Sequence, residues 1–249
     1  MNFQELIAES ERFYNKELNP KFWTNKSFDK SVRQKLLQIA EDVYEDLNID
    51  VEIADIQLTG SLANYNYNEN SDLDVHILLD FSQINDDKKL VKDALDGKRY
   101  VWNVKHDIKI RDHEVEIYYQ DVTEPHVASG LYSLLNDTWI EEPSYNPPTV
   151  DEKDVDLKAE SIRKDIERLA NDINDPNVSD DEARMIHERG KKIQEKISKM
   201  RKEGLAESGE FSVENLVFKQ LRNDGSIEKL FDSINNAYDE MFNEEKNEI

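Results

Sequence analysis

The sequence lacks cysteine, and it lacks any long uninterrupted apolar run. Without cysteine the protein has no disulfide framework, no thiolate metal site and no cysteine nucleophile. A membrane-spanning helix requires roughly 18 or more consecutive apolar residues, and the first residues of the chain also lack the basic and apolar regions of a signal peptide. We therefore expect a soluble protein with no membrane association, located in a reducing cytoplasm.

Positive charge is also scarce. The 249 residues include 55 Asp or Glu and 32 Lys or Arg, which gives a formal net charge of −23. Because proteins that bind nucleic acid irrespective of sequence rely on Lys and Arg to neutralise phosphates, we expect no generic nucleic-acid binding. Basic residues gather in one segment, from Arg184 to Lys202. That segment is either an acceptor or nucleic-acid platform or a charge pattern that complements the helix dipole, because acidic residues begin the same helix.

Apolar spacing divides the chain near residue 150. Before that point helical and strand patterns both occur, and Gly97 is suited to end a helix. The expected elements are two helices within residues 3–47, strands at 51–58 and 73–79, a helix at 86–95, and a hairpin formed by 101–110 and 114–120. Beyond Pro143, Pro147 and Pro148, every apolar pattern is helical.

Apolar stripes in the second half predict four helices. Two of them, around residues 162–173 and 183–200, are expected to pair as a hairpin, Ser212 is suited to cap the third, and the fourth runs along 227–241. The sequence therefore predicts an α+β chain, with a domain of strands and helices at residues 1–150 and an all-helical domain at residues 151–249.

Two aspartates, Asp72 and Asp74, begin the second predicted strand. Side chains two residues apart share a strand face, so both carboxylates project together while Leu73 and Val75 enter the core. Two neighbouring carboxylates repel each other unless a cation lies between them. Mg²⁺ takes such oxygen ligands and completes its shell with water and substrate phosphate. The pair therefore predicts a Mg²⁺ site, with Mn²⁺ as an alternative metal.

Gly60 and Ser61 follow the first strand, and ten residues separate Ser61 from Asp72. Glycine allows the backbone to approach a ligand closely, and Ser61 offers its hydroxyl and neighbouring N–H groups to phosphate oxygens. A phosphate cradle beside a carboxylate pair outlines a phosphoryl-transfer site. We therefore predict that Gly60 and Ser61 bind the phosphates of a nucleotide.

A two-metal site of this kind needs a third carboxylate, which can also act as base on an attacking hydroxyl. Our preferred candidate is Glu116, because Val115 and Ile117 flank it with apolar side chains in a later strand. Glu114 on the same face and Asp107 on a neighbouring strand are the alternatives. The predicted catalytic and metal-binding set is therefore Asp72, Asp74 and Glu116.

Positive charge must also meet a triphosphate in so acidic a protein. Lys105, Lys109 and Arg111 alternate along one face of a predicted strand, and we take Lys105 and Lys109 as candidate nucleotide-binding residues. The alternative is an ordinary solvated strand face. His76 lies on the face of Asp74, where it either touches a nucleotide or serves as a hydrogen-bonded structural histidine.

Taken together, Gly60, Ser61, Asp72, Asp74 and Glu116 resemble the signature of the DNA polymerase β-like nucleotidyltransferase superfamily, over about residues 50–120. The wider chain is similar to nucleotidyltransferase-like proteins encoded by tailed phages. The resemblance implies a mixed β-sheet covered by helices, and it implies that Asp72 and Asp74 bind Mg²⁺.

The function expected from these residues is Mg²⁺-dependent transfer of a nucleoside monophosphate from a nucleoside triphosphate, such as ATP, to an acceptor hydroxyl, with release of pyrophosphate. The acceptor is an RNA end or a nucleotide, or alternatively a small molecule or a protein side chain. A different class is an inactive nucleotide-binding regulator or antitoxin-like module. If the phage resemblance holds, the location is the cytoplasm of the infected bacterial host.

Overall fold

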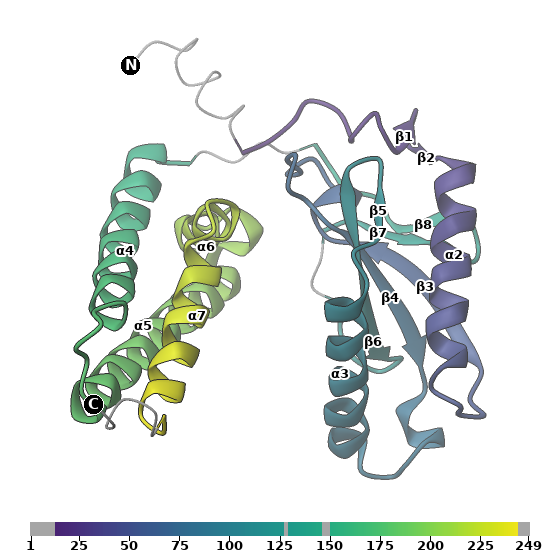
Figure 1. Cartoon of the computed structure of the whole chain (residues 1–249). Coiled ribbons are helices and arrows are strands. Elements are labelled where there is room, and N and C mark those ends of the chain that lie inside the picture. The colour runs from purple at the N-terminus through teal and green to yellow at the C-terminus, as the bar shows by residue number, and fades with distance from the viewer. Residues whose placement is uncertain (1–12, 127–128, 146–149, 244–249) are drawn as a thin grey trace, which may run out of the picture. The chain divides into compact units, whose positions relative to one another are not determined.

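The computed structural model describes residues 13–126, 129–145 and 150–243. The described residues before 146 belong to one compact unit and those after 149 to a second, and Figure 1 draws both. Among these residues, strands occur in the first unit alone, and the second is helical. The predicted α+β class is therefore confirmed. The helix expected to begin near Phe3 lies outside the described residues.

The first unit is built on a six-stranded sheet. Its strands are β3 (Ile53–Thr59), β4 (Leu73–Leu79), β5 (Lys109–Ile110), β6 (His113–Asp121), β7 (Leu131–Ser133) and β8 (Thr138–Glu141). They lie in the order β5-β6-β4-β3-β7-β8; β4 and β6 run parallel, and all other neighbours are antiparallel. The mixed sheet implied by the sequence resemblance is thus present. A small hairpin, β1 (Trp23–Thr24) and β2 (Ser27–Phe28), precedes it.

Alternation along the strands gives the sheet an apolar face and a polar face. The fully buried side chains of β4 are Leu73, Val75, Ile77 and Leu79. Helices α2 (Lys30–Glu45) and α3 (Lys88–Lys105) pack on this apolar side, where Tyr119 of β6, Val43 of α2 and Trp102 of α3 line one cavity. Burying each large aliphatic side chain stabilises the fold by about 1.5–3 kcal/mol. The opposite face carries the polar side chains of the strands.

Helix α2 begins where the sequence supplies a cap. The Asp29 carboxylate accepts hydrogen bonds from the N–H groups of Ser31 at 2.9 Å and Val32 at 3.1 Å. These N–H groups have no partner within the helix. The buried residues of the helix recur every three or four positions, so one side of it covers the sheet; they are Val32, Leu36, Ala40 and Val43.

Helix α3 corrects the prediction for residues 86–110. The predicted strand at 101–110 is wrong, because α3 continues through Gly97 to Lys105 and only Lys109–Ile110 are extended. The helix is held along the outer edge of β6: the Asn103 side chain donates to the Ile117 carbonyl at 3.3 Å and accepts from the Ile117 N–H at 3.2 Å. These tertiary contacts override the strand propensity of the β-branched and aromatic residues near 101–104.

The second unit contains the four predicted helices. They are α4 (Glu152–Ile173), α5 (Asp180–Ser208), α6 (Val213–Asn223) and α7 (Ser226–Glu240). Ser212 caps α6 by accepting from the Asn215 N–H at 3.3 Å, as expected. A Cβ added at Gly190 of α5 would lie 2.5 Å from Ile234 of α7, so glycine permits these two helices to pack closely. In the described part of the chain, no helix has the length and apolar character needed to cross a membrane.

Candidate active site

Three neighbouring strands bring Gly60, which follows β3, close to the predicted carboxylates. β4 lies between β3 and β6, and their registers pair Thr59 with Asp74 and Asp74 with Glu116. Paired residues of adjacent strands, which lie about 4.8 Å apart, project their side chains to the same face. Asp74 is therefore flanked by the end of β3 on one side and by Glu116 on the other. Asp72 lies two residues before Asp74, just ahead of the first residue of β4.

Gly60 packs directly against Asp74. Its backbone has φ +75° and ψ −162°, a conformation that is essentially restricted to glycine. A Cβ at this position would lie 1.9 Å from Oδ2 of Asp74, far inside any contact distance. Glycine is therefore required here for two reasons, and any larger residue would displace the carboxylate.

Ser61 connects the two ends of the loop between β3 and β4. Its hydroxyl donates to Oγ of Ser71 at 2.8 Å, and the Ser71 Oγ also accepts from the Asn68 N–H at 2.9 Å. The Ser71 carbonyl accepts from Nδ1 of His113, which is buried in β6, at 2.6 Å. The residue immediately before Asp72 is thus fixed by Ser61, which follows β3, and by His113 of β6. In this arrangement Ser61 positions the loop, and its binding to phosphate stays a prediction.

The environment of the acidic candidates separates Glu116 from its alternatives. Glu114 and Asp107 are 54% and 75% exposed, and both lie within 3.3 Å of the Lys109 ammonium. Glu116 is half-buried, is in register with Asp74, and accepts a hydrogen bond from the Tyr118 hydroxyl. Of the three candidates for the third acid, Glu116 is the one in register with Asp74.

Tyr118 is a member of this site that the sequence analysis did not identify. Burial, followed by the negative charge and hydrogen bonding of Glu116 and the charge of Asp74, raises the pKa of Tyr118, so its hydroxyl stays protonated and donates to Glu116. Its position two residues after Glu116 on the same strand face was the available signal. The guanidinium of Arg99, from α3, lies over the Tyr118 ring with Cζ 4.6 Å from the ring centroid.

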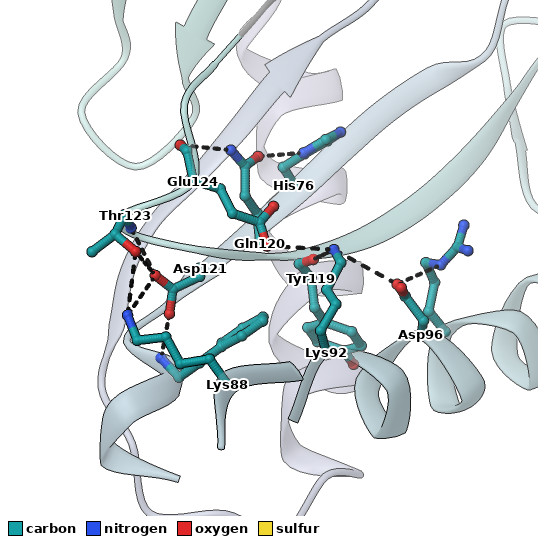
Figure 2. Close-up of polar contacts among 11 residues, drawn as sticks. His76, Lys88, Lys92, Asp96, Tyr119, Gln120, Asp121, Thr123 and Glu124 are labelled. Carbon is teal, nitrogen blue, oxygen red and sulfur yellow. Dashed lines mark hydrogen bonds and ion pairs between the residues drawn. The ribbon is translucent and has the colours of Figure 1, made fainter. Parts of the chain in front are cut away.

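His76 behaves as a neutral structural histidine. Burial lowers the pKa of His76 to about 4. Its Nδ1 lies 2.8 Å from Oε1 of Gln120, so Nδ1 is the donor, and the Gln120 amide donates in turn to the Glu124 carbonyl at 3.5 Å. Figure 2 shows these three residues in a row. The His76 ring also stacks on the Tyr118 ring at a centroid distance of 5.0 Å, which favours a supporting role beside the site.

The end of β6 is anchored by Asp121, whose contacts Figure 2 also shows. Its carboxylate accepts from the N–H groups of Phe81 and Thr123, each at 2.9 Å, and from the Lys88 ammonium at 3.0 Å. Burial acts in the opposite direction, but the hydrogen bonds from Thr123, Lys88 and Phe81 lower the pKa of Asp121 to about 2. This carboxylate stabilises the strand that carries Glu116.

The two predicted nucleotide-binding lysines do not share a strand face. Lys105 ends α3 and lines a cavity with Tyr119 and Val43 on the apolar side of the sheet, away from Glu116. Lys109 of β5 pairs with Glu114 at 3.2 Å and with Asp107 at 3.3 Å. Hydrogen bonds to these two carboxylates raise the pKa of Lys109. The shared face expected for these lysines is therefore wrong, because the segment that was to carry both is mostly helix.

The carboxylates fit Mg²⁺ as a partial ligand set. In residues 13–126, 129–145 and 150–243, no three His, Asp or Glu side chains gather closely enough to hold a metal ion by themselves. Mg²⁺ usually binds through one or two carboxylates and takes its other ligands from water and substrate phosphates. Asp74 and Glu116, in register on adjacent strands, offer hard oxygen ligands of that kind.

Gly60 packs on Asp74, and Glu116 lies in register beside Asp74 in a mixed sheet, as the sequence resemblance leads us to expect. Residues 33–133 match the family model of the nucleotidyltransferase domain. This match confirms the resemblance to the polymerase β-like superfamily, supports nucleotidyl transfer in general, and implies a nucleotide substrate. The matched segment contains Gly60, Ser61, Asp72, Asp74 and Glu116. No curated protein and no solved structure matches the chain.

Proposed function

We propose that this protein is a Mg²⁺-dependent nucleotidyltransferase that moves a nucleoside monophosphate from a nucleoside triphosphate, such as ATP, to an acceptor hydroxyl and releases pyrophosphate. The observation that carries the proposal is the register across β3, β4 and β6, which aligns Thr59, Asp74 and Glu116. The packing of Gly60 on the Asp74 carboxylate supports it. Mn²⁺ is an alternative metal for the same oxygen ligands.

Each residue of the site has a distinct task in this proposal. Asp72, Asp74 and Glu116 would supply carboxylate oxygens to the metal, with water and phosphate oxygens completing its shell, and the metal would neutralise charge on the triphosphate. Gly60 lets the backbone pass beside Asp74, and Ser61 with the following N–H groups meets phosphate oxygens. Glu116 accepts the proton of the acceptor hydroxyl as the oxygen attacks the α-phosphate. Tyr118, a hydrogen-bond donor to Glu116, fixes the direction of that carboxylate.

We assign catalysis to a domain at residues 1–150 and recognition of the acceptor to the helical domain at 151–249. The acceptor is an RNA end or a nucleotide, and small molecules and protein side chains are the alternatives. Exposed lysines of α5, such as Lys191, Lys192 and Lys196, offer positive charge in an otherwise acidic chain. We place the reaction in the cytoplasm, that of a phage-infected bacterium if the phage resemblance holds.

The test is to incubate the full chain with each α-labelled nucleoside triphosphate, Mg²⁺ and a panel of RNA, small-molecule and protein acceptors. Label on one acceptor, with stoichiometric pyrophosphate, is the expected result. Asp74→Asn should abolish the transfer while the protein remains folded. Nucleotide binding without pyrophosphate release, for all four nucleotides and every acceptor, would instead identify a binding regulator and refute the proposed enzyme.

A further inference from the structure

Arg99 brings a cation from helix α3 to the polar face of the sheet. Its guanidinium lies over the ring of Tyr118, with Cζ 4.6 Å from the centroid. The hydroxyl of that same ring donates to the Glu116 carboxylate. The Arg99 side chain is only 25% exposed. A positive group therefore stands beside the proposed catalytic carboxylates, in a partly desolvated position.

The N–H donors of Arg99 have no hydrogen-bond acceptor among the described residues. A guanidinium has five N–H donors, yet the Arg99 side chain donates no hydrogen bond within the part of the chain that the structure describes. Its buried Nε has no hydrogen-bond partner and forms an ion pair with Oδ1 of Asp96 at 3.6 Å. Buried polar groups without partners are costly, since water no longer satisfies them.

Another cation of α3 provides the contrast. The Lys92 ammonium donates to the Tyr119 carbonyl at 2.9 Å and lies 3.8 Å from Asp96 and 3.9 Å from Glu124, and Figure 2 shows it between these groups. Lys92 is therefore committed to fixing the helix against β6. Arg99 contacts the Tyr118 ring and forms an ion pair with Asp96, and its N–H groups donate to no acceptor among residues 13–126, 129–145 and 150–243.

We propose that Arg99 binds phosphate oxygens of the nucleoside triphosphate. This inference rests on the proposed function and names a cation for the triphosphate in place of Lys105 and Lys109. Phosphate oxygens are acceptors only, and their spacing matches the planar fork of a guanidinium better than a single ammonium. The Tyr118 ring holds the guanidinium in place, and the hydroxyl of the same ring donates to Glu116, which is in register with Asp74.

The experiment measures binding of magnesium tripolyphosphate to the full chain by titration calorimetry. Arg99→Gln should weaken binding on the order of 10-fold to 100-fold, the range expected when charge-assisted hydrogen bonds are lost. Arg99→Lys should be intermediate because it keeps the charge without the fork. Lys98→Gln removes the same charge from the neighbouring exposed residue and should change the affinity by less than about twofold.

Equal affinities for the wild type and Arg99→Gln overturn the proposal, and so does an equal loss in Lys98→Gln. A wild-type chain that does not bind tripolyphosphate also overturns it. If Arg99→Gln does not fold, the comparison of Arg99→Lys with Lys98→Gln decides in the same way.

Pyrophosphate release, measured in parallel, separates this inference from the proposed function. Wild-type release that Arg99→Gln leaves unchanged overturns the role of Arg99 alone. Tripolyphosphate binding that depends on Arg99, in a chain that releases no pyrophosphate from any nucleotide, supports the anion site and overturns the proposed enzyme alone.

Discussion

Replacing Gly60 with alanine tests how closely Gly60, which directly follows β3, packs against the Asp74 carboxylate. Two costs are expected. The backbone at φ +75° and ψ −162° is strained for any residue with a Cβ, on the order of 1–3 kcal/mol. The new Cβ would also lie 1.9 Å from Oδ2 of Asp74, and such overpacking costs typically about 1–3 kcal/mol as neighbours move. The sum is about 2–6 kcal/mol.

Two other glycines provide matched controls. Gly209 has nearly the same backbone, φ +70° and ψ −155°, but no atom lies within 4 Å of its would-be Cβ, so Gly209→Ala reports the backbone strain alone. Gly97 lies in the middle of α3, also with open space around it, so Gly97→Ala should stabilise the helix by about 0.5–1 kcal/mol.

The assay combines urea unfolding with pyrophosphate release. Gly60→Ala should lower the free energy of unfolding more than Gly209→Ala does, and it should lose most turnover because Asp74 is displaced. Gly209→Ala should keep the turnover of the wild type. If Gly60→Ala is no more destabilising than Gly209→Ala and remains fully active, the close packing of Gly60 on Asp74 does not matter and the reasoning is refuted.

Three further predictions concern the acids and the basic helix. Glu116→Gln should slow pyrophosphate release on the order of 10²–10⁴-fold and Glu114→Gln much less; the reverse ranking would give the role to Glu114. Asp121, with its pKa lowered to about 2, should stabilise the fold by roughly 2 kcal/mol above about pH 4 and lose this as the pH falls toward 2. Urea unfolding of the wild type and Asp121→Asn should therefore differ at about pH 6 and converge near pH 2, and a constant difference would contradict the assignment. Changing Lys191, Lys192, Lys196 and Lys199 to Gln should weaken an RNA acceptor and reduce its log–log salt slope by about 0.7 per lost contact; unchanged RNA binding would exclude α5 as the platform.

The strands that carry the site follow from the sequence for a simple reason. Alternation of apolar and acidic residues from Asp72 to Val75 has one consistent interpretation, a strand with a buried face, and Leu73 and Val75 are indeed 0% exposed. The same holds for Glu116 between Val115 and Ile117. Local pattern and tertiary burial agree at these positions, so spacing alone was sufficient to bring the acids to one face.

The segment around residues 97–110 could not be predicted in this way. Val101 and Val104 are 47% and 68% exposed, so these apolar residues do not mark a buried face. Gly97 lies inside α3 rather than at its end. The contacts that hold the helix are made by Asn103 to the backbone of Ile117, which no local pattern records. Because α3 was expected to end early, Arg99 was overlooked and Lys105 was placed on a strand.

The same contact of Asn103 determines where another chain could join this sheet. An exposed strand edge accepts a further strand through its free N–H and C=O groups. At Ile117 both groups are occupied by the Asn103 amide, and the Tyr119 carbonyl is occupied by Lys92. This stretch of β6, directly after Glu116, is therefore closed to a further strand, so a partner chain cannot extend the sheet at these positions beside the paired carboxylates.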